Sequence, residues 1–175
     1  MPRNVEIKAR LDGAAGLAAV AARAAALGAE GPRVIDQDDT FFACDNGRLK
    51  LRAFGDGQGE LIFYRRADTT GPKESFYVLA PVADCDALRE ALTLAYGQAG
   101  RVHKRRELWL AGRTRVHLDE VEALGMFLEL EVVLRDGEPV GDGEAEARAL
   151  LAALGVGTER LVEGAYVDLL RAAGS

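Results

Sequence analysis

The stretch of sequence that decides the fold is residues 4–11, NVEIKARL, in which polar and apolar residues alternate strictly. This alternation is typical of a β-strand that is buried on one face, because successive side chains of a strand point to opposite faces. Val5 and the odd-numbered residues after it share the apolar face, while Glu6, Lys8 and Arg10 share the other. The pattern therefore predicts a strand with one apolar face and one charged face.

Five later segments repeat this pattern, at residues 47–53, 60–66, 102–106, 113–119 and 127–133. On a single strand the pattern usually marks the solvated face of an antiparallel sheet, where Glu and Lys pair across strands. Taken together, the six charged faces are rich in Lys and Arg in a chain whose net charge is -6, so the cations are concentrated on these strands. If the six faces converged on one enclosed space, that space would suit a polyanion that carries a divalent metal.

The residue types on these faces suit triphosphate chemistry. Arg binds phosphate oxygens with a planar fork and Lys provides a compact point charge, so a mixed set can neutralise a triphosphate from several directions. Mg²⁺ and Mn²⁺ prefer oxygen ligands, usually one or two carboxylates together with phosphate oxygens and water. The candidate metal ligands are Glu6, Asp119, Glu129 and Glu131.

Several blocks of the chain resemble, in order, the signature blocks of one enzyme superfamily. Glu6-Ile7-Lys8 is similar to the second half of a Glu-x-Glu-x-Lys signature. The later blocks are residues 37–42 (QDDTFF), 49–52 (LKLR), 104–106 (KRR), 119–131 (DEVEALGMFLELE) and 166–170 (YVDLL). The chain therefore resembles the CYTH superfamily, the triphosphate tunnel metalloenzymes, which includes class IV adenylyl cyclases, thiamine triphosphatases and inorganic triphosphatases.

The resemblance implies an α+β fold that is mainly antiparallel β, with an eight-stranded closed or nearly closed barrel, peripheral helices and one domain over residues 1–175. It implies a hydrolase of inorganic or nucleoside triphosphates that binds its substrate in a basic tunnel. The implied cofactor is Mg²⁺ or Mn²⁺, held by Glu6, Asp119, Glu129 and Glu131. The implied substrate-binding residues are Lys8, Arg10, Lys50, Arg52, Arg66, Lys104, Arg106 and Arg115, with Lys8 and Arg52 as the catalytic candidates. Arg66 is preferred to Arg65 because it shares parity with Tyr64.

The chain departs from the family pattern at two places. Asn4 stands where the signature has its first Glu, and an amide oxygen is a weaker metal ligand than a carboxylate, which argues against a second metal. Phe41 and Phe42 offer no hydroxyl where thiamine triphosphatases have a Tyr, so thiamine triphosphate is a less favoured substrate. Two alternatives stay open: a class IV adenylyl cyclase that converts ATP to cyclic AMP and pyrophosphate, and a non-catalytic module that binds polyphosphate or a nucleotide.

Two residues near the predicted tunnel have more ordinary interpretations. His117 lies on a charged face and could act as a general acid or base, but a lone His in a strand is more often a hydrogen-bonded structural residue. Tyr166 belongs to the last family block, and we interpret it as helix packing near a tunnel mouth. The glutamates at positions 129 and 131 are expected to repel each other when no metal is bound.

The rest of the sequence favours a small protein without a membrane span. Helices are predicted over residues 12–27, 86–96, 144–154 and 161–173, and the glycines of residues 55–59 predict a hairpin turn. No run of about 18 apolar residues is present, and the acidic composition argues against nucleic-acid binding. Cys44 and Cys85 are predicted to be free thiols in a cytoplasmic protein. The expected partner is a small-molecule triphosphate, and a homodimer is the default expectation.

Overall fold

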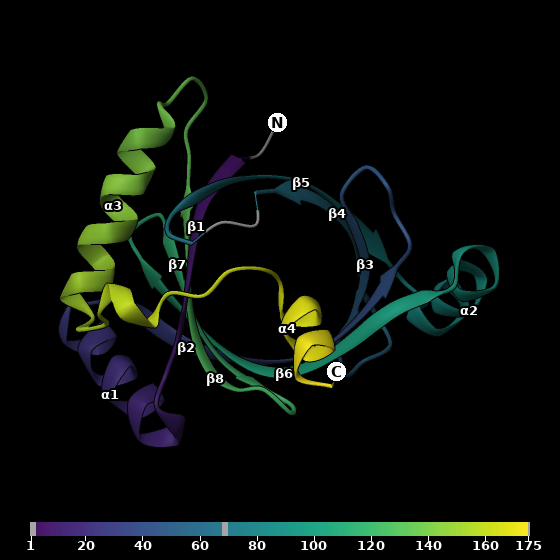
Figure 1. Cartoon of the computed structure of the whole chain (residues 1–175), viewed down its shortest axis with the longest axis horizontal. Coiled ribbons are helices and arrows are strands. Elements are labelled where there is room, and N and C mark those ends of the chain that lie inside the picture. Colours follow the sequence, from purple (N-terminus) through teal and green to yellow (C-terminus); the bar gives the residue numbers. More distant parts are fainter. Residues whose placement is uncertain (1–2, 68–69, 175) are drawn as a thin grey trace.

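Eight antiparallel strands close into a ring in the computed structural model, which describes residues 3–67 and 70–174 (Figure 1). In order around the ring they are β1 (Arg3–Arg10), β5 (Lys73–Val82), β4 (Gly59–Arg66), β3 (Arg48–Ala53), β2 (Glu30–Phe42), β6 (Gln98–Ala111), β7 (Thr114–Val121) and β8 (Gly125–Val133). The mainly antiparallel, eight-stranded fold predicted from the sequence is therefore confirmed. β2 and β5 were not identified by alternation, because their polar and apolar residues follow no regular period of two.

The helices lie outside the ring or across one end of it. α1 (Gly13–Ala26) and α3 (Val140–Ala153) lie side by side against one flank, and α2 (Cys85–Tyr96) lies beyond the opposite flank (Figure 1). α4 (Tyr166–Ala173) begins later than predicted, because residues 161–165 form an extended strap and Leu161 pairs with Ala9 of β1. No helix of the described residues is long and apolar enough to cross a membrane.

The largest apolar core lies between the ring and its helices. The outward side chains of β1, including Val5 and Ile7, pack with those of β7 and β8 against Val20 of α1 and Leu151 of α3. α3 approaches β1 closely at Gly143, where a Cβ atom would lie 2.8 Å from Val5 Cγ2. Because the apolar faces are covered from outside, the charged faces of the same strands point into the ring.

A second apolar cluster closes one end of the ring. It contains Phe41, Val102, Phe127 and Tyr166, and the rings of Phe127 and Tyr166 meet edge to face with their centroids 5.0 Å apart. Tyr166 is the first residue of α4, so the helix and this cluster together cover the end. The interior of the ring is therefore accessible from the other end.

Candidate active site

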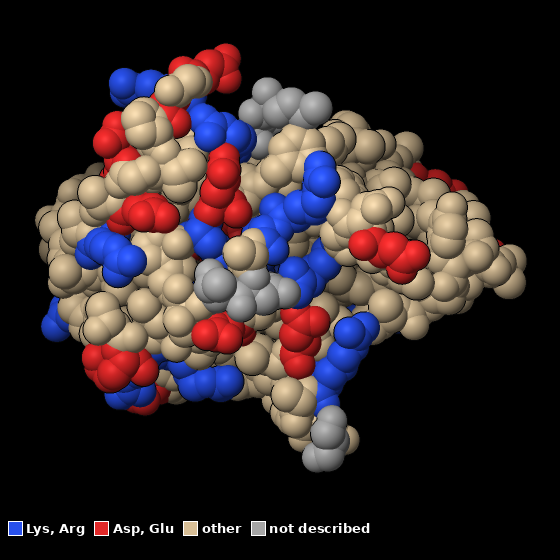
Figure 2. Space-filling model, turned by 45° about the horizontal axis from the view of Figure 1, so that its top comes forward, with Lys and Arg blue, Asp and Glu red and all other residues tan. Residues whose placement is uncertain are grey.

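The inward charged residues line one cavity of about 740 Å³ inside the ring. Among the described residues that line it, eight are Lys or Arg and seven are Asp or Glu. The predicted tunnel was basic, whereas the cavity has nearly balanced charges. It includes Asp36, Asp39 and Asp56, which lie outside the six alternating segments, and Glu60, which shares parity with Arg66. Figure 2 shows Lys and Arg side chains gathered at the centre of one face, with Asp and Glu around them.

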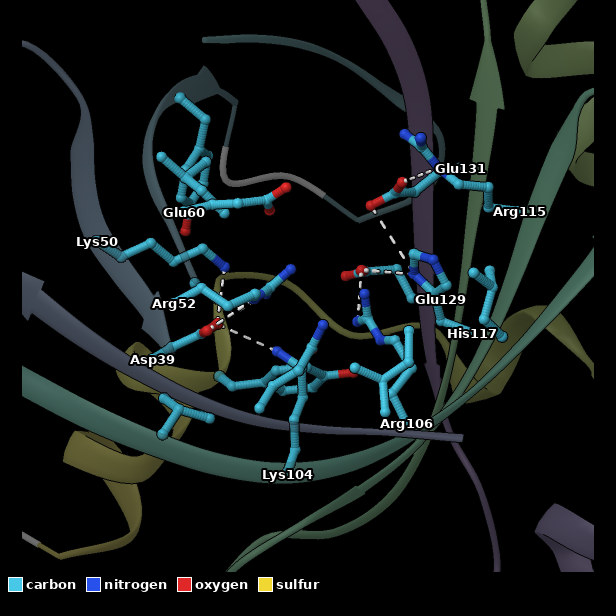
Figure 3. Close-up of a pocket in the computed structure, with 18 of the residues that line it drawn as sticks. Asp39, Lys50, Arg52, Glu60, Lys104, Arg106, Arg115, His117, Glu129 and Glu131 are labelled. Atoms are coloured by element: carbon cyan, nitrogen blue, oxygen red, sulfur yellow. Dashed lines mark hydrogen bonds and ion pairs between the residues drawn. The ribbon is translucent and has the colours of Figure 1, made fainter. Parts of the chain in front are cut away.

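One wall of the cavity carries a surplus of positive charge around Asp39. This carboxylate is 1 % exposed, and it accepts hydrogen bonds from Lys50 Nζ at 2.8 Å, Arg52 Nε at 2.7 Å and Lys104 Nζ at 3.2 Å (Figure 3). Burial opposes the ionisation of Asp39, but the three cations hold its pKa well below the usual range. One carboxylate shared by three cations leaves positive charge for an anion, so we name these four residues the cationic wall.

The cationic wall contains a lysine that titrates near neutrality. Burial, together with the neighbouring Arg52 and Arg106, lowers the pKa of Lys104 to about 7, although Asp39 opposes the shift. A bound anion would reverse this effect, because it supplies the negative charge that the buried ammonium lacks.

The opposite side of the cavity carries His117, Glu129 and Glu131, which we name the acidic wall. His117 of β7 is directly opposite Glu129 of β8 in the strand register. Its Nδ1 lies 3.5 Å from Glu129 Oε1 and 3.8 Å from Glu131 Oε1 (Figure 3). One candidate ligand atom from each of the three residues lies within 4.8 Å of the others. The acidic wall could therefore hold one divalent ion.

Cations offset the repulsion expected between the two glutamates. Lys8 Nζ lies 3.4 Å from Glu129 Oε2, Arg106 Nη2 lies 3.3 Å from Glu129 Oε1, and Arg115 Nε lies 2.8 Å from Glu131 Oε2. Burial raises the pKa of Glu129, but Lys8, His117 and Arg106 together hold it well below the usual value. The glutamates are therefore ionised and paired with cations when no metal is bound.

The extended strap before α4 forms the closed end of the cavity. The carbonyl oxygen of Gly164 accepts hydrogen bonds from Lys8 Nζ at 3.2 Å and from Arg66 Nη2 at 3.3 Å. The ring of Tyr166 lies 4.0 Å from Lys8 Nζ, and its hydroxyl donates to Asp119 Oδ2 at 2.8 Å. Burial lowers the pKa of Lys8 to about 8 even though Glu129 is near.

The structure brings most of the sequence-predicted site residues to this cavity. Those that line it are Glu6, Lys8, Lys50, Arg52, Arg66, Lys104, Arg106, Arg115, Glu129 and Glu131. Glu6 Oε2 accepts a hydrogen bond from Arg66 Nη1. Glu6 is directly opposite Glu131 in the register of β1 and β8. Arg65, the alternative to Arg66, is exposed and lies over the rings of Phe63 and Phe76.

Arg10 and Asp119 are not among the residues that line the cavity. Both are paired with Phe127 in the strand register, and the ring of Phe127 fills the interior at that level together with Tyr166. Arg10 is exposed and donates to the Leu124 carbonyl oxygen. Asp119 is fully buried and binds Arg106 and Tyr166. Parity predicted the face of each residue correctly but could not show where the cavity ends.

Sequence reasoning missed three residues of the site. Asp39 and Gln37 belong to a family block and share parity with Phe41, and that signal could have placed them inside the ring. Tyr166 was assigned to helix packing, but it also covers Lys8 inside the cavity. Gln37 Oε1 and Asn4 Oδ1 are buried, line the cavity and have no hydrogen-bond partner among the described residues. Gln37 is opposite Lys104 on the side of the cationic wall, whereas Asn4 is on β1, which pairs with β8 of the acidic wall, so its unpaired oxygen fits a site for a divalent metal there.

Comparisons with known proteins agree with this geometry. The family model described as the CYTH domain matches residues 2–166. No curated protein matches the chain. The PH1012 protein from Pyrococcus horikoshii OT3 has a similar structure, with a TM-score of 0.84, 22% identity and coverage of 95% of this chain and 98% of that chain.

Two further solved structures share the fold. A putative adenylate cyclase from Vibrio parahaemolyticus has a TM-score of 0.75 and 16% identity, covering 96% of this chain and 97% of that chain. The Pct1 RNA triphosphatase from Schizosaccharomyces pombe has a TM-score of 0.50 and 12% identity, covering 94% of this chain and 86% of that chain. At these identities the likeness concerns the fold alone, whereas the family model covers nearly the whole sequence. The chain therefore belongs to the CYTH family.

Proposed function

We propose that this chain is a divalent-metal-dependent hydrolase that cleaves the terminal phosphoryl group of a triphosphate inside the cavity. The observation that carries the proposal is that the cationic wall faces the acidic wall across one cavity (Figure 3). A metal–triphosphate complex has the complementary arrangement, with anionic oxygens on one side and a cation on the other. Family membership supports the same chemistry.

The residues divide the work by position. Lys50, Arg52 and Lys104 would bind phosphate oxygens, with Asp39 orienting all three side chains. Glu129 and Glu131 would hold Mg²⁺ or Mn²⁺, with Glu6 as a third carboxylate beside them. When bound, the metal supplies Lewis-acid polarisation of phosphate oxygens. Asp119 then has a different role from the one predicted, because it orients Arg106 from outside the cavity lining.

Lys8 is placed to stabilise the terminal phosphoryl group. Its ammonium lies between Glu129 and the Gly164 carbonyl oxygen at the closed end, where the ring of Tyr166 covers it and Lys8 is buried. Hydrolysis breaks the bond between the terminal phosphorus and its bridging oxygen, forms a bond from phosphorus to the oxygen of water, and releases phosphate, a diphosphate and a proton. Positive charge fixed at the terminal group stabilises this transition state without further rearrangement.

The proposal is tested by incubating the pure protein with tripolyphosphate, ATP or thiamine triphosphate, each with Mg²⁺ or Mn²⁺, and measuring phosphate release. We expect release from at least one substrate, and a loss of about 100-fold or more in kcat/KM for Lys8→Met and Arg52→Met. Arg105→Met is the matched control, because Arg105 is on β6 but is exposed and absent from the cavity lining. Absence of phosphate release from all three substrates with both metals would overturn the proposal.

A class IV adenylyl cyclase is the second candidate, favoured by the open end of the cavity. Val34 is 47 % exposed, Leu79 is 48 % exposed, and both line the cavity together with Phe54. Inorganic triphosphate has no apolar atoms that could pack against these side chains, whereas the organic part of a nucleotide would contact them. The same incubation with ATP distinguishes the candidates, because a cyclase yields cyclic AMP and pyrophosphate. Binding without any product would instead indicate a binding module.

A further inference from the structure

We propose that His117 is a metal ligand, and that the acidic wall therefore binds transition metals such as Mn²⁺, Co²⁺ and Zn²⁺ in preference to Mg²⁺. This inference rests on the metal site of the proposed function and deepens it. The sequence favoured a structural, hydrogen-bonded interpretation of His117, and the structure has one such contact, which is long, at 3.5 Å between His117 Nδ1 and Glu129 Oε1. Metal binding would be a second role for the same imidazole.

The first argument is the spacing around His117 Nδ1. The carboxylate oxygens of Glu129 and Glu131 lie 3.5 Å and 3.8 Å from it. These separations exceed the range of about 2.7–3.2 Å over which N–H···O hydrogen bonds are usually made. Two ligand atoms that each lie about 2.1 Å from one ion, at a tetrahedral angle, are about 3.4 Å apart. The spacing is therefore long for hydrogen bonds and close to that of ligands sharing an ion.

The second argument is the direction of the carboxylate oxygens. Glu131 uses Oε2 to accept from Arg115, so its Oε1 is the oxygen that faces His117. Glu129 faces Lys8 with Oε2 and the imidazole with Oε1. One oxygen of each glutamate thus lies beside the imidazole nitrogen, with the three ligand atoms within 4.8 Å of one another. Lys8 and Arg115 contact the other two oxygens, and Arg106 Nη2 also lies 3.3 Å from Glu129 Oε1. Such fixed partners orient metal ligands.

The third argument is an independent one, from Asn4. Its side chain is 2 % exposed and lines the same cavity, and its Oδ1 has no hydrogen-bond partner among the described residues. Asn4 is two residues before Glu6 on β1, and Glu6 is directly opposite Glu131. A buried oxygen without a donor costs free energy that a cation could offset. The amide oxygen is thus a further potential metal ligand on the strand that pairs with β8.

The donor set decides the metal preference. An imidazole nitrogen beside the carboxylates of Glu129 and Glu131, with Glu6 and the Asn4 amide oxygen on the adjoining strand, suits borderline transition metals, whereas Mg²⁺ prefers oxygen ligands and retains its waters. Asn4 in place of the signature's first Glu carries no negative charge, which lowers the electrostatic attraction for every divalent ion. The His117 nitrogen compensates transition metals for this loss, whereas Mg²⁺ gains little from a nitrogen ligand.

Metal binding is measured without substrate. Free Mn²⁺ is followed by electron paramagnetic resonance, Co²⁺ by its visible absorption, and Mg²⁺ by competition against Mn²⁺. We expect His117→Ala to weaken Mn²⁺ and Co²⁺ binding by about tenfold or more, while Mg²⁺ affinity changes by less than about threefold. His103→Ala is the matched control, because the chain has two histidines and His103 is exposed on the outer face. Equal losses for all three metals, or no loss, would overturn the inference.

A measurement on the unmodified protein covers the case in which His117→Ala fails to fold. Because there are only two histidines, their imidazole nitrogen resonances can be assigned by NMR. Zn²⁺ should shift the resonance of His117 Nδ1 and leave His103 unchanged, and Mg²⁺ should shift neither by as much. A Zn²⁺ titration that leaves His117 unshifted would contradict the inference. If the protein binds metal through His117 but hydrolyses no triphosphate, the proposed function alone is overturned. If it hydrolyses a triphosphate but the His117 resonance does not respond to metal, this inference alone is overturned.

Discussion

At the scale of single residues, the site is controlled by the burial of charged groups. Burial lowers the pKa of Lys104 to about 7 and that of Lys8 to about 8, because neighbouring arginines add to the shift and the nearby carboxylates oppose it only in part. An empty cavity therefore holds less positive charge in weak alkali than the sequence indicates. Binding of a polyanion must restore that charge, because the bound phosphates favour the protonated ammonium groups.

We predict that tripolyphosphate binding at pH 8 takes up protons, by about one proton more in the wild type than in Lys104→Met. The pKa of Lys104 is about 7, so at pH 8 its amine is mostly neutral before binding and becomes charged afterwards. At pH 6 the amine is already protonated, so the difference should disappear. Calorimetry in buffers with different ionisation enthalpies measures the uptake.

The control for this prediction is Arg115→Met, which also removes one cation from the cavity wall. An arginine does not titrate in this range, so Arg115→Met should weaken binding while leaving the proton uptake at pH 8 unchanged. Equal uptake by the wild type and Lys104→Met would show that Lys104 is charged before the anion arrives.

We also predict that Glu129→Gln destabilises the metal-free protein by about 2 kcal/mol, because Lys8 and Arg106 lose a buried counter-ion. The pKa of Glu129 is held below its ordinary value of 4.5, so the carboxylate contributes stability above that pH and loses it in acid. The difference from wild type should therefore narrow as the pH falls below 4.5. Urea unfolding measures both effects, with exposed Glu120→Gln as the neutral control. If Glu129→Gln is instead more stable than the wild type, the repulsion between Glu129 and Glu131 that the sequence predicts outweighs their pairing with cations.

At the scale of elements, the contact between α3 and β1 shows how closely the outer helices fit the ring. Gly143 allows the approach, because a Cβ there would meet Leu134 Cδ2 at 2.7 Å and Val5 Cγ2 at 2.8 Å. Val5 points outward from the strand whose Glu6 and Lys8 line the cavity. Packing on the outer face thus holds the position of charged residues on the inner face.

Gly143→Ala should lower the free energy of unfolding by about 1–3 kcal/mol, because the added methyl overpacks the contact. Gly141→Ala in the same helix is the matched control, since a Cβ there meets nothing within 4 Å. This control should be neutral or stabilising by up to about 1 kcal/mol, as expected for Ala in a helix. Thermal unfolding of the pair measures the difference, and equal stabilities would show that α3 moves freely away from β1.

At the scale of the whole molecule, the ring is closed by β1. This strand pairs with β8 over Asn4–Arg10 but with β5 over the shorter stretch Arg3–Glu6. An ion pair between Glu6 and Arg66 of β4 spans the same region from inside the cavity. The β1–β5 pairing is therefore the part of the ring with the least support from backbone hydrogen bonds.

We predict that amides of residues 73–76 exchange with deuterium sooner than those at the long β2–β6 pairing, because local opening begins where few backbone hydrogen bonds must break. Native-state hydrogen exchange with peptide mass analysis measures this order. Tripolyphosphate with Mn²⁺ should slow exchange at residues 73–76, since ligand binding stabilises the closed ring. If these residues exchange last, the ring opens elsewhere.

The sequence by itself determined which side chains face the interior. Period-two alternation placed Lys8, Lys50 and Arg52 inward, and parity selected Arg66 over Arg65, because neighbouring residues of a strand necessarily point to opposite faces. The order of the family blocks extended this local information to the eight-stranded ring. These features depend on residues close together in the chain, so they could be recognised without coordinates.

Only the tertiary structure decided which charges meet and where the cavity ends. Asp39 gathers cations from β3 and β6, and His117 meets Glu129 and Glu131 through the register of β7 and β8. Phe127 and Tyr166 close the interior and leave Arg10 and Asp119 out of the cavity lining. These contacts join residues far apart in the chain, and their geometry depends on strand register and packing, which alternation within one strand does not encode.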